Sequence, residues 1–298
     1  MTTTPGDPHL ALLAQRLTDA GLPAEQVRAA PGGFATVAGF AHLRDGRDVF
    51  AKTAEGPGEG AFAGEADGLV ALARAGLPTP AVLAVRPDLL VLERLRPVPE
   101  GDDAFWERLG RTLAAVHAST EAPRFGWHRT TWLGRLPQDN TWDDDGFAFF
   151  ARRRLLRWLP EPRVRAKLDD ADRAALERLC ERLPELLPPR PACLVHGDLW
   201  AANVLAGHEG APAVVDPAVS FTWAEVDLAH LCLTPGPPGI ARAVAAYAEA
   251  AGLDDGWRDR LPLIQLRQHL TLMAQYDDDW GSTEATKALL APFRASAQ

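Results

Sequence analysis

The chain has 298 residues, of which 47% are hydrophobic and 24% are charged. This length can form one large domain or two lobes with a shared cleft, and the composition excludes a disordered protein. A formal net charge of −9 disfavours a duplex-binding surface, so we expect no nucleic-acid partner. No basic segment precedes a long apolar run near the first residue, and no run of about eighteen uncharged apolar residues occurs anywhere. We therefore expect a cytoplasmic protein that does not enter a membrane.

The three cysteines, Cys180, Cys193 and Cys232, are far apart, and each has apolar neighbours. Their odd number and their spacing fit neither a disulfide framework nor a metal site. We expect buried thiols in a reducing compartment, and a redox role for them stays open.

The first predicted elements are a short amphipathic helix within residues 1–21 and a β-hairpin with strands at 34–43 and 48–53. An Asp45-Gly46 turn joins the two strands. Gly32 and Gly33 stand at the start of the hairpin, where their backbone N–H groups could approach phosphates. A simple turn is an equally good interpretation of this glycine pair.

A helix is predicted at residues 61–75, because Gly76 and Pro78 follow it as a stop signal. Glu65 shares the apolar face of this helix with Leu69 and Leu72, so its carboxylate needs a partner. Lys52, near the end of the preceding strand, is the nearest candidate. The pair could be an ordinary ion pair, but we favour the lysine–glutamate pair that positions nucleotide phosphates in kinases.

Two more strands, at 81–85 and 89–93, complete a predicted sheet of about five strands, and a polar, proline-rich connection follows at 96–102. That connection is the best candidate for a boundary between lobes. Glu93, Arg94 and Leu95 directly precede it, and by position alone they are candidates for an adenine site.

After a predicted helix at 103–119, residues 121–146 lose all periodicity and are rich in Trp, Gly, Asn and Asp. A long aromatic loop in a compact domain is usually functional. Gln138, Asn140 and Trp142 could line a pocket for a polyol or sugar, since Trp faces and amide groups suit such ligands. An aromatic surface loop without a ligand is the alternative.

Residues 192–217 read as three short strands with polar residues at their ends. In kinase-like phosphotransferases an Asp accepts the proton of the attacking hydroxyl, an Asn beyond it binds magnesium, and an Asp after the next hairpin binds magnesium at the phosphates. Asp198, Asn203 and Asp216 have this order and spacing. Turn capping by these residues is the plainer alternative. Helices at 147–159, 170–187, from 225, and at 240–251, 257–276 and 283–293 make the rest of the chain helical, so the fold class is α+β.

The sequence resembles the fructosamine-3-kinase, or ketosamine kinase, family of the aminoglycoside phosphotransferase and choline kinase-like superfamily. The motifs that carry the resemblance are Val-Phe-Ala-Lys at 49–52, Phe-x-x-Glu at 62–65, Pro-Gln-x-Asn-x-Trp at 137–142, Phe-Phe-Ala-Arg-x-Arg-Leu at 149–155, His-Gly-Asp-Leu-Trp-x-x-Asn-Val at 196–204 and Asp-Pro-Ala at 216–218.

The resemblance implies a two-lobed, protein kinase-like fold, with a small, mainly antiparallel sheet and one key helix in the N-terminal lobe. Residues 1–95 would bind the nucleotide, and residues 96–298 would form a larger helical lobe with the catalytic loop and the acceptor site. The expected reaction is transfer of the γ-phosphate of ATP, with Mg²⁺, to the 3-hydroxyl of a ketosamine, free or on a protein lysine. The phosphorylated product is unstable and regenerates the amine, so the role would be deglycation. We expect a monomer or a weak homodimer.

The resemblance also implies roles for individual residues. Asp198 would be the catalytic base, Asn203 and Asp216 would hold magnesium, and Lys52 and Glu65 would set the phosphates. Trp200 would face the sugar, and Asp227 would brace the catalytic loop.

The chain departs from the family pattern at Ala201-Ala202 and at Ser220-Phe221-Thr222, both near the expected acceptor side. Two alternatives stay open. One is a small-molecule kinase of the aminoglycoside or choline type, for which the acidic runs at 143–145 and 277–279 could bind a cationic acceptor. The other is a nucleotide-binding pseudokinase that serves as an interaction module.

Overall fold

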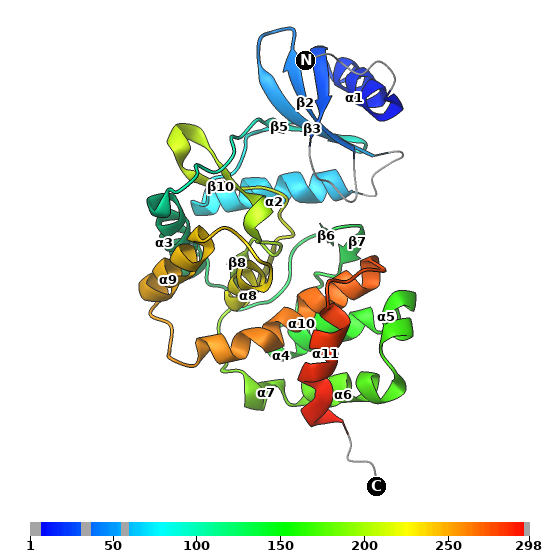
Figure 1. Ribbon diagram of the computed structural model, residues 1–298, viewed down its shortest axis with the longest axis vertical. Coiled ribbons are helices and arrows are strands. Elements are labelled where there is room, and N and C mark those ends of the chain that lie inside the picture. Colours follow the sequence, from blue (N-terminus) through cyan, green and yellow to red (C-terminus); the bar gives the residue numbers. More distant parts are fainter. Residues whose placement is uncertain (1–6, 31–36, 55–59, 295–298) are drawn as a thin grey trace. The chain divides into compact units, whose positions relative to one another are not determined.

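The computed structural model describes residues 7–30, 37–54 and 60–294, and these form two compact units along the chain. The first unit comprises Met1–Phe105 and Ala202–Pro217, and the second comprises Trp106–Ala201 and Ala218–Gln298. Figure 1 shows the elements of each unit. The assignment of nucleotide binding to residues 1–95 and of the acceptor to residues 96–298 stays a prediction.

The first unit is built on a five-stranded antiparallel sheet with the strand order β1-β2-β3-β5-β4. Its strands are β1 (Ala24–Ala29), β2 (Val37–Leu43), β3 (Asp48–Thr53), β4 (Val82–Arg86) and β5 (Leu89–Glu93). The predicted hairpin of β2 and β3 is confirmed, although residues 34–36 of its first strand lie outside the described residues, and the two further predicted strands are present as β4 and β5. The sequence did not predict β1, an edge strand with no fully buried residue, because the strand has no regular apolar alternation.

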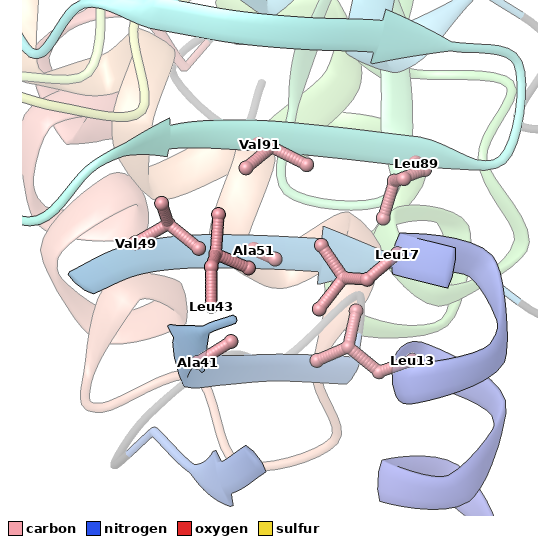
Figure 2. Close-up of a cluster of buried hydrophobic side chains, with 8 residues drawn as sticks. All are labelled: Leu13, Leu17, Ala41, Leu43, Val49, Ala51, Leu89 and Val91. Atoms are coloured by element: carbon pink, nitrogen blue, oxygen red, sulfur yellow. The ribbon is translucent and has the colours of Figure 1, made fainter. Parts of the chain in front are cut away.

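One face of the sheet is covered by helix α1 (Pro8–Asp19). Leu13 and Leu17 of the helix pack on this face, as Figure 2 shows. The strand residues of the same cluster are Ala41, Leu43, Val49, Ala51, Leu89 and Val91. Side chains alternate along a strand, so the residues between these point to the other face.

Helix α2 (Ala61–Ala75) covers that other face. Its Phe62, Ala66 and Leu69 pack against Leu90 and Leu92 of β5. The strand β3 alternates in the same way, because Val49 and Ala51 belong to the cluster on the α1 side. Lys52 therefore points to the face covered by α2, which is the helix that carries Glu65.

The second unit is mostly helical, which confirms the expected α+β class. Its main helices are α3 (Asp103–Ser119, whose first turn belongs to the first unit), α4 (Gly146–Phe149), α5 (Pro162–Lys167), α6 (Asp170–Glu181), α7 (Leu183–Leu186), α8 (Glu225–Leu233), α9 (Gly239–Ala251), α10 (Trp257–Gln275) and α11 (Ser282–Leu290). The helix predicted at 147–159 exists, but its central part, Phe150–Leu155, is a π-helix, and Leu156–Trp158 is a 3₁₀ turn.

Three two-stranded sheets complete the described structure. In the second unit β6 (Thr131–Leu133) pairs with β7 (Leu136–Gln138), inside the loop for which the sequence predicted no element, and β8 (Cys193–Val195) pairs with β11 (Ser220–Thr222). In the first unit β9 (Val204–Ala206) pairs with β10 (Pro212–Val214).

Two further expectations concern the surface. Among the described residues, no helix is both long enough and apolar enough to cross a membrane. Cys180 and Cys193 are buried as expected, but Cys232 is exposed, so the prediction of a third buried thiol was wrong. Cys232 lies near the C-terminal end of α8, and its neighbour Leu231 is the residue that points into the core.

Candidate active site

The first unit gathers one cation and two anions at the α2 face of its sheet. The Nζ of Lys52 donates to Oε1 of Glu65 at 2.9 Å, which confirms the expected pair. The same Nζ also donates to Oδ1 of Asp216. Lys52 is 7% exposed. A buried ammonium held by two carboxylates is fixed in position.

The three charges shift one another's pKa values. Burial alone would lower the pKa of Lys52, but the Glu65 and Asp216 carboxylates reverse this effect, and the net shift is upward. Burial, together with the nearby Asp216 carboxylate, raises the pKa of Glu65, although Lys52 opposes the change. Lys52 is therefore always charged near neutral pH, as a phosphate ligand must be.

Asn203 and Asp216 lie at the same end of the hairpin formed by β9 and β10. Asn203 directly precedes β9, and the backbone N–H of Val215, just after β10, donates to its carbonyl oxygen at 3.0 Å. Asp216 has a left-handed backbone with φ of 57°, an uncommon conformation for a residue other than glycine. Its side chain is 45% exposed. Carboxylate and amide oxygens are ligands that Mg²⁺ accepts, usually together with phosphate oxygens, so the donor set fits the predicted metal.

The structure shows less about the other residues predicted to bind the nucleotide. Gly32 and Gly33 lie outside the described residues. Glu93 ends β5, and its backbone N–H and side chain are both engaged with the backbone of Ala81. Arg94 is exposed, with one guanidinium nitrogen 3.2 Å from a carboxylate oxygen of Asp48. A contact of Glu93, Arg94 and Leu95 with adenine stays a prediction.

In the second unit a buried carboxylate organises the loop that carries Asp198. The two oxygens of Asp227, on α8, accept the backbone N–H groups of His196 and Gly197, each at 2.8 Å. Nε2 of His117 lies 3.2 Å from the same carboxylate, and the other ring nitrogen of His117 is 2.8 Å from the hydroxyl of Tyr247. Burial alone would raise the pKa of Asp227, but the hydrogen bond and charge of His117 and the Gly197 N–H lower it. This geometry fits the bracing role that the resemblance implies.

Gly197 explains why the motif requires glycine before Asp198. Its φ is +81°, and a Cβ at this position would stand 2.2 Å from the carbonyl oxygen of Ala218. The backbone N–H of Ala218 in turn donates to the carbonyl of His196 at 2.8 Å. The loop thus packs backbone to backbone, which leaves no room for a side chain.

Asp198 and Trp200 are both half-buried, and Leu199 between them is fully buried. The backbone N–H of Asp198 donates to Nδ1 of His196 at 3.2 Å. Nδ1 of His230, on α8, lies 3.3 Å from Oδ1 of Asp198. Burial is the largest cause that lowers the pKa of His230, to about 3, so this ring is neutral beside the Asp198 carboxylate.

Gln138 and Asn140 lie inside the second unit. The amide of Gln138 donates to Oγ1 of Thr131 at 3.1 Å and to the carbonyl of Ala218 at 3.2 Å. Its Oε1 accepts from Nη2 of Arg267 at 2.7 Å. The two amide groups are 2% and 3% exposed, so direct contact with a sugar would require these bonds to break.

Asn140 belongs to the same polar network. It donates to Oγ1 of Thr131 at 2.8 Å, and its Oδ1 accepts from Nη2 of Arg154 at 2.7 Å. Arg154, inside the π-helix, is 1% exposed and also donates to Oγ of Ser220 at 3.1 Å. This contact explains the polar residue at the start of β11.

Trp142, by contrast, is exposed, and a ligand can reach it. Its ring lies 6.1 Å from that of Phe221, which in turn lies 5.6 Å from the ring of Trp127. The guanidinium of Arg124 stands 5.6 Å from the centre of the Trp142 ring. Three aromatic side chains from one loop and from β11 thus form a surface cluster.

Sequence reasoning missed the buried cation Arg267 and the neutral His230. Arg267 lies on the long helix α10, whose sequence around it, Gln-Leu-Arg-Gln-His at 265–269, gives no sign that this Arg is buried. Both residues sit on buried helical faces, a position that in most proteins indicates packing.

Comparison with known proteins shows the family to which the chain belongs. The family model described as fructosamine kinase matches residues 9–291. A crystal structure of a fructosamine-3-kinase candidate from Thermobifida fusca superposes with a TM-score of 0.82 at 32% identity, covering 94% of this chain and 98% of that one. A protein named as a probable ketoamine kinase from Klebsiella aerogenes is 34% identical over 86% of this chain and 88% of its own. A chloroplastic protein-ribulosamine 3-kinase from Oryza sativa is 30% identical over 61% of this chain and 55% of its own.

The fold and the site thus define a kinase-like phosphotransferase that acts on a hydroxyl group. Within that class, the chain belongs to the fructosamine kinase family.

Proposed function

We propose that the protein transfers the γ-phosphate of ATP, with Mg²⁺, to the 3-hydroxyl of a ketosamine. The observation that carries the proposal is the trio of Lys52, Glu65 and Asp216 in a member of the fructosamine kinase family. The relatives named as ketoamine and ribulosamine 3-kinases support the acceptor class and the position of the hydroxyl.

In this reaction Lys52 neutralises charge on the nucleotide phosphates, and Glu65 keeps its ammonium in place. Asp216 and Asn203 would hold Mg²⁺, which supplies further charge neutralisation at the phosphates when it is bound. The acceptor oxygen forms a bond to the γ-phosphorus while the bond between that phosphorus and the bridging oxygen breaks. The electron pair of the broken bond leaves with ADP. Asp198 accepts the proton of the acceptor hydroxyl.

On the acceptor side, Trp200 and the exposed Trp142 are the candidates for contact with the sugar. A tryptophan face suits the C–H surface of a sugar, and the carbon chain of a lysine can lie on an aromatic cluster. Gln138 and Asn140 act indirectly, because their amide groups are bonded inside the protein. The 3-phosphate product is unstable and releases the amine, so the expected role is deglycation.

The test is ADP release by the purified protein with Mg–ATP and one of four acceptors: ribulose-lysine, fructose-lysine, an aminoglycoside or choline. Asp198→Asn serves as the blank, because it keeps the volume of the side chain but not its basicity. Turnover on a ketosamine alone, lost in the blank, is the expected result. Turnover only on another acceptor would support the phosphotransferase activity but contradict the proposed ketosamine substrate. A protein without turnover on any of the four acceptors would contradict the proposal.

A further inference from the structure

One side of helix α8 meets the catalytic loop at two places. Asp227 accepts the backbone N–H groups of His196 and Gly197, each at 2.8 Å. His230 follows three residues later on the same side of the helix, and its Nδ1 lies 3.3 Å from Oδ1 of Asp198. The helix thus contacts both the backbone of the loop and the side chain of the proposed base.

The ring of His230 is buried and uncharged. The residue is 5% exposed, and burial is the largest cause that lowers its pKa to about 3, followed by the positive charge of Arg267. The Asp227 carboxylate opposes this change but does not reverse it. A neutral imidazole carries one proton, on either Nδ1 or Nε2, and the surroundings of the two nitrogens decide which one.

The nitrogen that faces Asp198 is poorly satisfied. Nδ1 of His230 is buried and forms no hydrogen bond with any described residue, which is unfavourable for a polar atom. The Asp198 oxygen at 3.3 Å can become its partner after a small rotation of the ring or of the carboxylate. Hydrogen bonds between catalytic groups are often long or poorly aligned in an enzyme without its substrate, and they tighten when the substrate binds.

The carboxylate also determines where the ring proton lies. An unprotonated Nδ1 would direct its lone pair at a carboxylate oxygen, and the two would repel each other. A protonated Nδ1 donates to that oxygen instead.

We propose that His230 is a positioning residue for phosphoryl transfer: its Nδ1–H donates to Oδ1 of Asp198 and orients the carboxylate, so that the other oxygen takes the proton of the acceptor hydroxyl. This inference rests on the proposed function, since Asp198 is the base of that reaction. A donor fixed on a helix selects one orientation of a side chain that could otherwise rotate. A neutral donor suits this task, because a charged donor in the same hydrogen bond would make the carboxylate a weaker base.

The first test needs no substrate. Nitrogen NMR of protein labelled with ¹⁵N-histidine distinguishes the two neutral forms of the ring, and the signals of His230 are assigned through their loss in His230→Asn. We expect the proton on Nδ1, and we expect the Nδ1 signal to move in Asp198→Ala, where the acceptor is gone. A proton on Nε2 in the wild-type protein would overturn the inference, and so would an Nδ1 signal that Asp198→Ala leaves unchanged.

The second test compares kcat on the acceptor that supports turnover. His230→Leu removes the donor, so kcat should fall about tenfold while the KM for Mg–ATP stays unchanged. His230→Asn should recover part of the loss, because its amide nitrogen is as many bonds from Cα as Nδ1 is and keeps an N–H donor there. A folded His230→Leu protein with the wild-type kcat would overturn the inference, as would equal losses in the two variants.

His269→Leu is the matched control. His269, on α10, is 8% exposed, and its Nδ1 lies 3.1 Å from Oγ of Ser282 on α11. This variant should lower stability in urea and leave kcat near the wild-type value. An equal fall of kcat in His269→Leu and His230→Leu would contradict the inference, because the loss of any buried histidine would then have the same effect.

The NMR test decides the inference if His230→Leu does not fold, because it uses the wild-type protein and Asp198→Ala. It also separates the inference from the proposed function. A proton on Nδ1 that responds to Asp198→Ala, in a protein that phosphorylates no ketosamine, would contradict the proposed substrate and support the contact between His230 and Asp198.

Discussion

Lys52 stands between two carboxylates, and its removal has a specific consequence. In Lys52→Met the negative charges of Glu65 and Asp216 lose the cation that offsets them, and the nucleotide phosphates lose a ligand. We expect kcat/KM for Mg–ATP to fall by roughly a hundredfold or more, as measured by steady-state kinetics. Lys167→Met is the matched control, since Lys167 forms an ion pair with Asp279 in the second unit. An equal fall in kcat/KM for Mg–ATP in both variants would contradict the assignment of Lys52 as a phosphate ligand.

The buried carboxylate of Asp227 should affect the stability of the folded protein and the dependence of that stability on pH. The two oxygens of Asp227 accept two backbone N–H groups. An Asn in this position has only one oxygen, and its NH₂ group would face the second N–H donor without a hydrogen bond. Asp227→Asn should therefore lose roughly 3 kcal/mol of unfolding free energy at pH 7, measured in urea.

The pH dependence follows from the lowered pKa of Asp227 in the folded protein. The contribution of its carboxylate is fully present above the ordinary value of 3.8 and is lost as the pH falls through the folded value. The gap in stability between wild type and Asp227→Asn should thus narrow in acid. Asp145→Asn is the control, because one oxygen of Asp145 caps α4 and Asn keeps that oxygen. A gap that widens in acid would refute the bracing role.

At the scale of an element, the turn between β8 and Asp198 depends on Gly197. Gly197→Ala combines a left-handed backbone with a Cβ at 2.2 Å from the Ala218 carbonyl, so the loop must move. We expect kcat to fall by about a hundredfold or more. Gly252, which ends α9 with φ of +59°, meets nothing within 4 Å, so Gly252→Ala should cost only about 1 kcal/mol. Similar kinetics for the two variants would show that the loop tolerates a side chain.

The sequence predicts elements well where the apolar pattern is regular. Helix α2 and the hairpin of β2 and β3 follow from periodicity and turn residues, and the same periodicity placed Glu65 on the face toward Lys52. Edge strand β1 could not be found in this way, because Glu25, Gln26 and Arg28 leave no alternating pattern. The π-helix at Phe150–Leu155 is also invisible to a 3.6-residue period.

Part of the site could not be predicted for a different reason. Gln138 and Asn140 look like sugar ligands, because polar side chains in an aromatic loop usually face water. Their direction is decided by two cations that need buried acceptors: Arg267, 129 residues from Gln138, and Arg154, 14 residues from Asn140. Motif spacing locates Asp198, Asn203 and Asp216, but no local pattern shows which distant side chain a buried amide will meet.

At the scale of the whole molecule, the boundary between the two units falls after Ala201, between the proposed base and the proposed metal ligands. Nucleotide binding and acceptor chemistry should therefore be separable by mutation. With Mg–ATP at about 100 times its Kd, the wild-type protein should gain roughly 2.7 kcal/mol of stability, seen as a higher Tm. Asp216→Asn should lose most of this gain, whereas Asp198→Asn should keep it. If Asp198→Asn alone lost the stabilisation by Mg–ATP, the proposed roles of Asp198 as base and of Asp216 as metal ligand would be contradicted.

The proposed reaction places the phosphate on the 3-hydroxyl of a ketosamine, and the product then releases its amine. The most direct measurement follows the reaction of fructose-lysine or ribulose-lysine with Mg–ATP by ³¹P and ¹H NMR. We expect the signal of a new phosphate ester coupled to the proton on carbon 3, which decays as free lysine and inorganic phosphate appear. In Asp198→Asn neither the ester nor the free lysine should appear. A stable ester, or one on another carbon, would contradict the proposed reaction.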